Sequence, residues 1–187
     1  SLAFMGELVF EKPLGKSSPP IALIPYLNTL AQKDFVAKAT DSRIKVGGDA
    51  KIGIGNGMIL DITANPDFSN VEVDDIFTNL TRFELFLPEK RQFFIDNNDL
   101  FGSFGSSLDA IPFFSRRVGL ARDTLGSLIE NRIIGGTRLS GKLDDNWRLG
   151  LLNIQTAEDA PNEIASNNNA MIAVQRKVFS RSNIGAF

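Results

Sequence analysis

The chain has 187 residues, of which 43% are hydrophobic and 22% charged, as is typical of a globular domain and unlike a disordered tail or a coiled coil. Twenty Lys and Arg residues face 22 Asp and Glu residues, and this balance argues against nucleic-acid binding. The absence of Cys and His excludes disulfides, thiol nucleophiles, Ser-His-Asp triads and zinc sites built on those residues, and no cofactor is indicated. The longest apolar run, Ala170–Val174, is far shorter than the about 20 residues of a spanning helix.

An all-β fold of antiparallel hairpins is predicted, because apolar and polar residues alternate with a period of two. The sequence divides into an N-terminal segment and linker, a first hairpin region, an insert rich in aromatic and charged residues, and a second hairpin region. The predicted boundaries are 1–20, 21–76, 77–131 and 132–187. We expect the strand pattern to continue beyond Phe187.

The first hairpin is predicted from Arg43 to Ala64. From Arg43 to Ile54, charged residues fall on one phase and Ile, Val and Ala on the other, and the alternation resumes from Met58 to Ala64. Gly55-Asn56-Gly57 between them predicts a tight turn. Upstream, two extended segments are predicted, over Ile21–Leu30 and Asp34–Thr40. Strands of about 9 to 12 residues have the length that crosses a bilayer at a tilt.

The insert differs in composition from the hairpin regions. Nine of the fifteen Phe residues fall between Phe77 and Phe114, among Pro, Gly and Ser, which favours a structured, irregular insert over an array of strands. Within it, Asn79–Leu87 fits either a short helix or a strand.

The second hairpin region begins with alternation from Arg132 to Lys142. Asp144-Asp145-Asn146 predicts the turn, and Trp147–Thr156 predicts the returning strand. A loop is expected over residues 157–169, then a strand over Ala170–Phe179, and Asn183–Phe187 resembles the start of another strand.

A cluster of charges among Phe residues is the main candidate site, and it consists of Arg82, Glu84, Glu89, Lys90 and Arg91. Carboxyl groups beside apolar rings can act as general acids, and a pair can hydrolyse glycosides. The candidate catalytic residues are Glu84, Glu89, Asp96 and Asp99. The preferred interpretation is structural, with Glu84 and Glu89 paired to Arg82, Lys90 or Arg91 inside the insert.

Two further groups have alternative interpretations. Asp96, Asp99 and Asp144 belong to runs of oxygen donors of the kind that bind calcium, but they lack EF-hand spacing and are more typical of turns. Arg116 and Arg117 are suited to binding a phosphate, although lining a polar lumen or bridging to the carboxylates of the insert is preferred.

Several segments resemble a bacterial family of unknown function whose members usually carry a module similar to carbohydrate-binding module family 9. The central segment runs from Asn79 through Leu87-Pro88-Glu89-Lys90-Arg91 to Phe94. The other four, in the same order as in the family, are Gly47–Lys51, Asn65–Glu72, Phe114–Gly119 and Leu149–Glu158.

This resemblance implies an envelope protein of Gram-negative bacteria, often Bacteroidota, with a β-barrel in the outer membrane. Some members are labelled membrane-associated hydrolases. The carbohydrate-binding module and the later strands of a complete barrel are missing from this chain, so they would lie outside it.

The first functional hypothesis is therefore a non-catalytic segment of an outer-membrane β-barrel associated with carbohydrate binding or uptake, with the insert in or over the lumen. Its expected partners are outer-membrane lipid and carbohydrate, and its expected location is the outer membrane or periplasm. The alternatives are a soluble glycan hydrolase that uses the carboxylates of the insert, and a soluble carbohydrate-binding β-sandwich.

Overall fold

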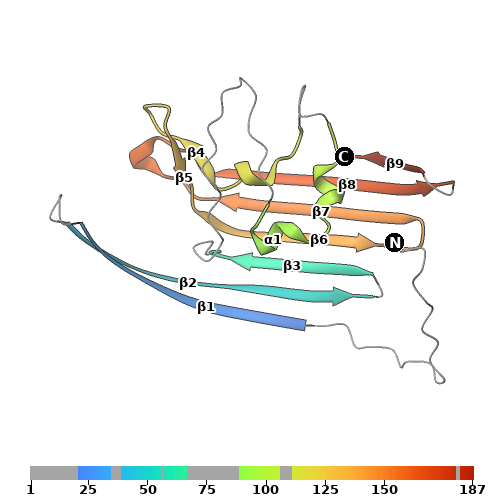
Figure 1. Cartoon of the computed structure of the whole chain (residues 1–187), viewed down its shortest axis with the longest axis horizontal. Coiled ribbons are helices and arrows are strands. Elements are labelled where there is room, and N and C mark those ends of the chain that lie inside the picture. The colour runs from blue at the N-terminus through green and yellow to red at the C-terminus, as the bar shows by residue number, and fades with distance from the viewer. Residues whose placement is uncertain (1–20, 35–38, 56, 67–88, 106–110, 180–181) are drawn as a thin grey trace, which may run out of the picture.

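The computed structural model describes residues 21–34, 39–55, 57–66, 89–105, 111–179 and 182–187. Within these ranges, seven strands form one antiparallel sheet in which spatial order follows chain order (Figure 1). The strands are β1 (Ile21–Asp34), β2 (Ala39–Ile54), β3 (Met58–Ala64), β6 (Ile133–Lys142), β7 (Trp147–Thr156), β8 (Asn167–Val178) and β9 (Ser182–Ala186). β1 and β9 are the edge strands of this open sheet, so the closure into a barrel stays a prediction.

Both predicted hairpins are confirmed. Ile54 of β2 pairs with Met58 of β3 across the Gly55–Gly57 turn, and Lys142 of β6 pairs with Arg148 of β7. Gly141 of β6 has a φ of +142°, and an added Cβ atom there would collide with the carbonyl oxygen of Gly57 in the β2–β3 turn.

Several strand boundaries differ from the prediction. β2 begins at Ala39, before the predicted start at Arg43, and includes the end of the segment Asp34–Thr40 that was predicted as a separate extended piece. The first extended segment continues as β1 to Asp34, beyond the predicted end at Leu30. β8 begins at Asn167, inside the stretch 157–169 that was predicted as a loop. Asn167 pairs with Thr156 of β7, so backbone pairing with a neighbouring strand overrides the low strand propensity of the Asn run.

The insert between β3 and β6 holds short elements. They are α1 (Gln92–Ile95), α2 (Asn98–Gly102), the 3₁₀ helix η2 (Ser115–Arg117), β4 (Leu120–Arg122) and β5 (Leu128–Glu130). The insert also holds one pair of three-residue strands that the sequence did not predict, β4 and β5. They pair through a turn where Asp123 Oδ1 accepts hydrogen bonds from the backbone of Leu125 and Ser127. Asn79–Leu87 lies outside the described residues. The 3₁₀ helix η3 (Ala160–Asn162) lies between β7 and β8.

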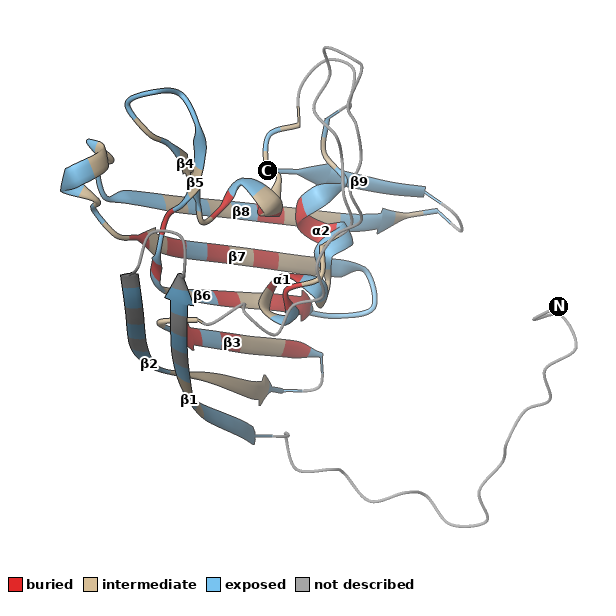
Figure 2. Ribbon diagram, turned by 60° about the vertical axis from the view of Figure 1, so that its left-hand side comes forward, coloured by how far each residue is buried: buried red, intermediate tan, exposed pale blue. Residues whose placement is uncertain are grey.

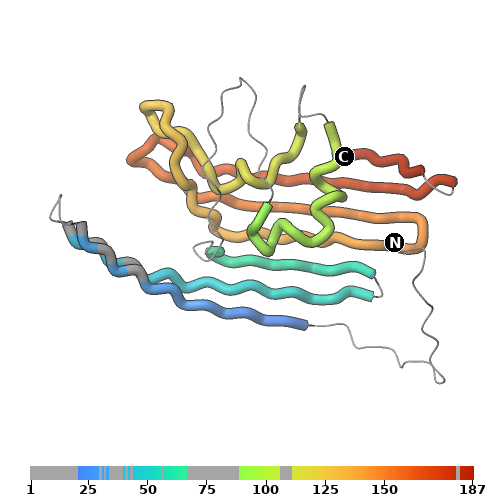
Figure 3. The backbone as a smooth tube through the Cα atoms, viewed as in Figure 1, coloured from blue at the N-terminus to red at the C-terminus, as the bar shows by residue number. Residues whose placement is uncertain are grey.

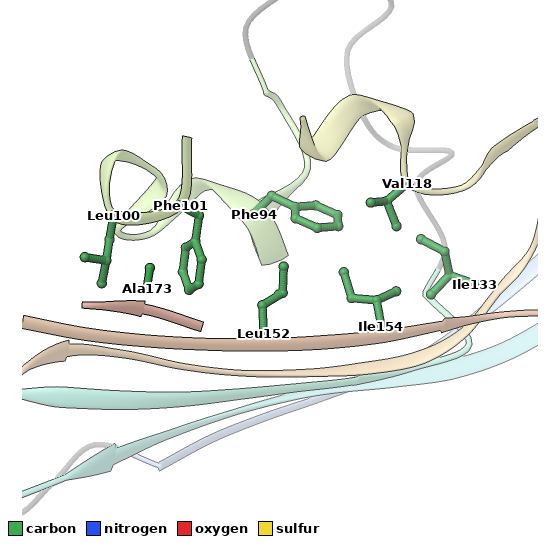
Figure 4. Close-up of a cluster of buried hydrophobic side chains, with 8 residues drawn as sticks. All are labelled: Phe94, Leu100, Phe101, Val118, Ile133, Leu152, Ile154 and Ala173. Atoms are coloured by element: carbon green, nitrogen blue, oxygen red, sulfur yellow. The ribbon is translucent and has the colours of Figure 1, made fainter. Parts of the chain in front are cut away.

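The insert packs over one face of the sheet, above β6, β7 and β8 (Figures 2 and 3). Helices of four or five residues are unstable alone and are held here by packing. The core consists of eight buried side chains at this interface, four from the insert (Phe94, Leu100, Phe101, Val118) and four from the sheet (Ile133, Leu152, Ile154, Ala173) (Figure 4).

Close approach of the insert to the sheet depends on a glycine. An added Cβ atom at Gly150 of β7 would lie 2.7 Å from Phe101 Cζ and 3.0 Å from Leu100 Cδ2. The absence of a side chain at this position therefore lets α2 rest directly on the strand.

The opposite face of the sheet, here called the open face, is apolar. Successive strand residues point to opposite faces, and the phase opposite the insert carries exposed side chains such as Leu23, Ile44 and Ile172, which are 71%, 74% and 61% exposed. Among the described residues, the insert covers only the other phase. A large exposed apolar surface indicates an interaction site.

Candidate functional site: an ionic interface between insert and sheet

A buried ion pair lies at the centre of the face that the insert covers. Arg138 of β6 is 1% exposed, and its Nη2 and Nε donate hydrogen bonds to Asp61 Oδ2 of β3 at 2.8 and 3.3 Å. These two residues stand opposite each other in the β3–β6 register. Removing two charges from water costs free energy, and the attraction between the charges offsets that cost. The pair therefore stabilises the contact between β3 and β6 only when both charges are present.

Lys51 of β2 and the carboxylate of Asp96 from the insert extend this ion pair. Lys51 of β2 lies 3.6 Å from Asp61 Oδ1 and also donates a hydrogen bond to Asp96, which follows α1. The guanidinium of Arg138 lies over the ring of Phe93, 5.4 Å from its centroid. Charges from three strands and the insert therefore meet in one cluster.

A second polar contact joins α2 to the sheet. Arg148 of β7 donates to both carboxylate oxygens of Asp99, at 2.6 and 3.0 Å, and its Nη1 also donates to Gln175 Oε1 of β8 at 2.9 Å. Nearby, Asn97 Nδ2 donates to Ser140 Oγ of β6 at 3.1 Å. The paired hydrogen bonds of Arg148 fix the orientation of the helix over β7.

A third polar contact lies within the insert. Arg91 Nε and Nη2 donate to the two oxygens of Glu89, at 2.9 and 2.8 Å, while Nη1 and Nη2 donate to the carbonyl oxygens of Val118 and Ser115. The guanidinium also lies 4.3 Å from the centroid of the Phe94 ring. Arg91 thus ties the start of α1 to the segment around η2.

Two of the candidate carboxylates, Glu89 and Asp99, have lowered pKa values. Burial alone would raise the pKa of Glu89, but hydrogen bonds from Arg91 and Ser115 outweigh it and hold the pKa below the ordinary 4.5. Hydrogen bonds from Arg148 hold the pKa of Asp99 below its ordinary value. A general acid needs the opposite shift, so this geometry favours structural roles for both.

The other candidate acidic residues, Asp96 and Asp144, contact different partners. Asp144 Oδ1 accepts hydrogen bonds from the backbone of Asn146 and Trp147, as expected for a turn, while Asp96 contacts Lys51. No group of three or more acidic residues suited to a metal ion occurs in the described ranges. Arg116 and Arg117 lie in η2, and Lys90 precedes α1; each has interaction partners. Arg82 and Glu84 lie outside the described residues.

A cleft of about 430 Å³ opens on the insert side of the sheet, beside η2 and the start of β8. Its lining includes aromatic rings, amides and one guanidinium, from Phe113, Phe114, Arg117, Asn131, Asn167 and Asn169. The exposed lining of the cleft is more polar than apolar, unlike the mostly apolar pockets that bind drug-like molecules.

Sequence reasoning missed Asp61, Arg138 and Arg148 as site residues. Arg138 lies on the polar phase of its strand, and so does Asp61, but a period of two shows only which face a residue occupies. Asp61 and Arg138 meet because β3 pairs with β6, although the insert separates these two strands in the sequence.

No helix in the part of the chain that the structure describes has the length and apolar character needed to span a membrane.

The fold and the interface define a class of protein: an antiparallel meander with one face under an ionically anchored insert and one apolar face open. The chain belongs to the family defined by a domain of unknown function, DUF5916, whose model matches residues 19–176. Searches of curated proteins and of solved structures found no match.

Proposed function

We propose that the chain is a non-catalytic part of the wall of a β-barrel in the outer membrane of a Gram-negative bacterium. The open face would contact lipid, and the face under the insert would line the lumen. The observation that carries this proposal is the exposed apolar surface of the open face, which lies opposite a face that includes buried charges on β3 and β6. Transmembrane barrels alternate lipid-facing apolar residues with polar residues that face the interior.

The central strands illustrate this contrast. On β3, Asp61 and Thr63 are buried under the insert, whereas Leu60 and Ile62 belong to the open face. A soluble sheet with this pattern would bury its apolar phase against a second layer. In the proposed arrangement the bilayer takes the place of that layer, and the insert lies inside the barrel.

A closed barrel of this type has at least about eight strands. Seven described strands would therefore form part of the wall, and further strands would complete it. The carbohydrate-binding module implied by the resemblance would be a separate domain of the same protein.

An association with carbohydrate is the finer part of the proposal. It is supported by the cleft beside η2, where Phe113 and Phe114 offer aromatic surface and Asn167 and Asn169 offer amides. A glycan that binds this cleft would raise the stability of the folded protein in proportion to RT ln(1 + [L]/Kd), and Asn169→Ala would reduce that increase. A panel of soluble oligosaccharides without any effect on unfolding would remove this part of the proposal.

The membrane proposal is tested by placing Arg at the centre and at the edge of the apolar surface of one strand. The two variants are Ile172→Arg and Asn168→Arg. Both residues lie on the open face of β8, four residues apart along the strand. In lipid, Arg near the bilayer midplane costs about 2–4 kcal/mol and near the interface about 0–1 kcal/mol. The measurement is the free energy of unfolding by urea in lipid vesicles.

A water-exposed face gives a different result. Ile172 is 61% exposed, and exposed substitutions usually change stability by within about 0.5 kcal/mol. Equal, small effects of the two variants, together with recovery of the parent protein in a monomeric soluble fraction, would overturn the proposal. In that case a soluble domain, such as a sandwich or hydrolase, becomes the better hypothesis, and Glu89→Gln would then separate catalysis from folding.

A further inference from the structure

The cleft beside η2 is formed by segments that are far apart in the sequence. Its lining comes from the residues around η2, the residue Asn131 shortly before β6, the end of β7, and the start of β8 with the connection that precedes it. The hairpin β4–β5, which follows η2, and the β7–β8 connection lie at the same end of the sheet (Figure 1). With about 430 Å³, the cleft has a volume within the range of about 300–1,000 Å³ that is usual for ligand sites.

The side of β8 that faces the insert changes its character at this cleft. Ala173 and Met171 pack into the core under the insert, whereas the next residues of the same phase, Asn169 and Asn167, line the cleft. Asn167 Nδ2 donates a hydrogen bond to Asn169 Oδ1 at 3.4 Å, and the backbone oxygen of Asn167 accepts one from Thr156 Oγ1 at 3.2 Å. Asn is unfavourable in strands, and residues that break a local preference are expected at functional sites.

Asn131 is the residue of the cleft that most requires a partner. It is 7% exposed, and its backbone N–H donates to the carbonyl oxygen of Gly119 at 2.8 Å. Its side-chain amide has no hydrogen-bond partner within the part of the chain that the structure describes. In that same part, the only fully enclosed side-chain atom without a partner is Arg138 Nη1. The amide of Asn131 therefore reaches accessible space, and the cleft is the space that this residue lines.

An amide at the base of a cleft is suited to hydroxyl groups. Buried polar groups in native proteins are almost always hydrogen-bonded, so the unpaired amide of Asn131 indicates a partner from outside the chain. An amide presents a donor and an acceptor side by side, and a hydroxyl group can use either. Two neighbouring hydroxyl groups of a sugar ring match both atoms of the amide.

The charge of the cleft favours an acidic ligand. Its described lining carries one cation, Arg117, and no carboxylate. A guanidinium binds a carboxylate or a sulfate through paired hydrogen bonds that a neutral group does not form. Phe113 supplies an apolar surface beside these polar groups, and its ring contacts the buried ring of Phe101 with the centroids 6.4 Å apart.

We infer that the cleft binds a sugar unit that carries an acidic group, with Asn131 bonded to its hydroxyl groups and Arg117 to its carboxylate or sulfate. The inference rests on the proposed association with carbohydrate and specifies the class of sugar. A neutral sugar could use Asn131 but would not use the charge of Arg117.

Titration calorimetry of the 187-residue chain tests the acidic preference with two matched pairs of sugars. Trigalacturonic acid is compared with galactotriose, and galactose 6-sulfate with galactose. An acidic sugar should bind about tenfold more tightly than its neutral counterpart, and the difference should shrink as the salt concentration rises. A preference in only one pair supports the inference and identifies the acidic group. Equal binding within both pairs would overturn it and leave the carbohydrate association standing, while no binding of any sugar would overturn both.

The role of Arg117 is tested by Arg117→Gln, which changes an exposed side chain. This variant should lose the preference for the acidic sugar and retain the weaker binding of the neutral one. The matched control is Arg122→Gln on β4, which removes the same charge from a residue outside the lining and should retain the preference. An unchanged preference in Arg117→Gln would overturn the assignment of the acidic group to this residue.

The role of Asn131 is tested by Asn131→Leu. The variant should lose binding of both kinds of sugar, and its ligand-free form should melt at a higher temperature, because an apolar side chain of similar size replaces an unpaired amide. The control is Asn162→Leu in η3, where Asn162 Nδ2 donates to Asp159 Oδ2 at 2.7 Å; it should melt at a lower temperature and bind normally. A lower melting temperature or unchanged sugar binding for Asn131→Leu would overturn the assignment of Asn131 to the ligand.

Discussion

Removal of one charge from the buried pair of β3 and β6 should be strongly destabilising. In Asp61→Asn, the guanidinium of Arg138 loses its anionic partner at 2.8 Å while only 1% exposed, and Lys51 remains close by as a second cation. Breaking one side of a buried pair costs about 3–5 kcal/mol. With an m-value of about 2 kcal/mol per molar urea, the unfolding midpoint should fall by about 2 M.

Urea titration followed by Trp147 fluorescence and far-ultraviolet circular dichroism measures this shift. The matched control is Asp49→Asn on the same face of β2. Asp49 accepts a hydrogen bond from the neutral Thr63 hydroxyl at 2.6 Å, and the amide oxygen of the variant can still accept it, so the cost should be at most about 1 kcal/mol. The double variant Asp61→Leu with Arg138→Met should recover most of the loss, since apolar pairs replace buried ion pairs well. Equal, small shifts for Asp61→Asn and Asp49→Asn would refute the reasoning.

Two further predictions concern the contact of the insert with the sheet. Gly150→Ala should lower the free energy of unfolding by about 1–3 kcal/mol, because the added Cβ atom would press on the buried ring of Phe101. The control Gly48→Ala, whose Cβ atom would lie 3.6 Å from its nearest neighbours, should be neutral or slightly stabilising. Thermal unfolding compares the two variants, and equal effects would contradict close packing at Gly150. Because the pKa of Glu89 is depressed when folded, its ion pair stabilises the protein above the ordinary pKa of 4.5, and this stabilisation is lost as the pH falls through the lower, folded value. The melting-temperature gap between the parent and Glu89→Gln should therefore narrow with acidification from about pH 6, and a gap independent of pH would show that Arg91 does not depend on the charge of Glu89.

The local part of the fold was predictable from the sequence. The alternation from Arg43 to Ala64 and the glycines of its turn determine the strands, their faces and the register of β2 with β3, because all three depend on neighbouring residues. The second hairpin followed in the same way from its alternation and its Asp-Asp-Asn turn.

The non-local part was not predictable. Asp61 and Arg138 pair across 77 residues of sequence, and a period of two gives no information about which strands become neighbours. The helices of the insert are too short for a helical period, and they exist because Phe94, Leu100 and Phe101 pack on the sheet. The early start of β8 similarly reflects pairing with β7 against the propensity of its Asn residues.

The long interval between β3 and β6 also predicts an order of folding steps. Joining residues 77 apart costs about 2 kcal/mol more in chain entropy than closing a ten-residue loop. Because most connections within β1–β3 and within β6–β9 are short, we expect the two arrays to pair internally before they join along the β3–β6 seam. The Asp61–Arg138 pair lies on that seam, and its charges are withdrawn from water only when the two halves of the sheet meet.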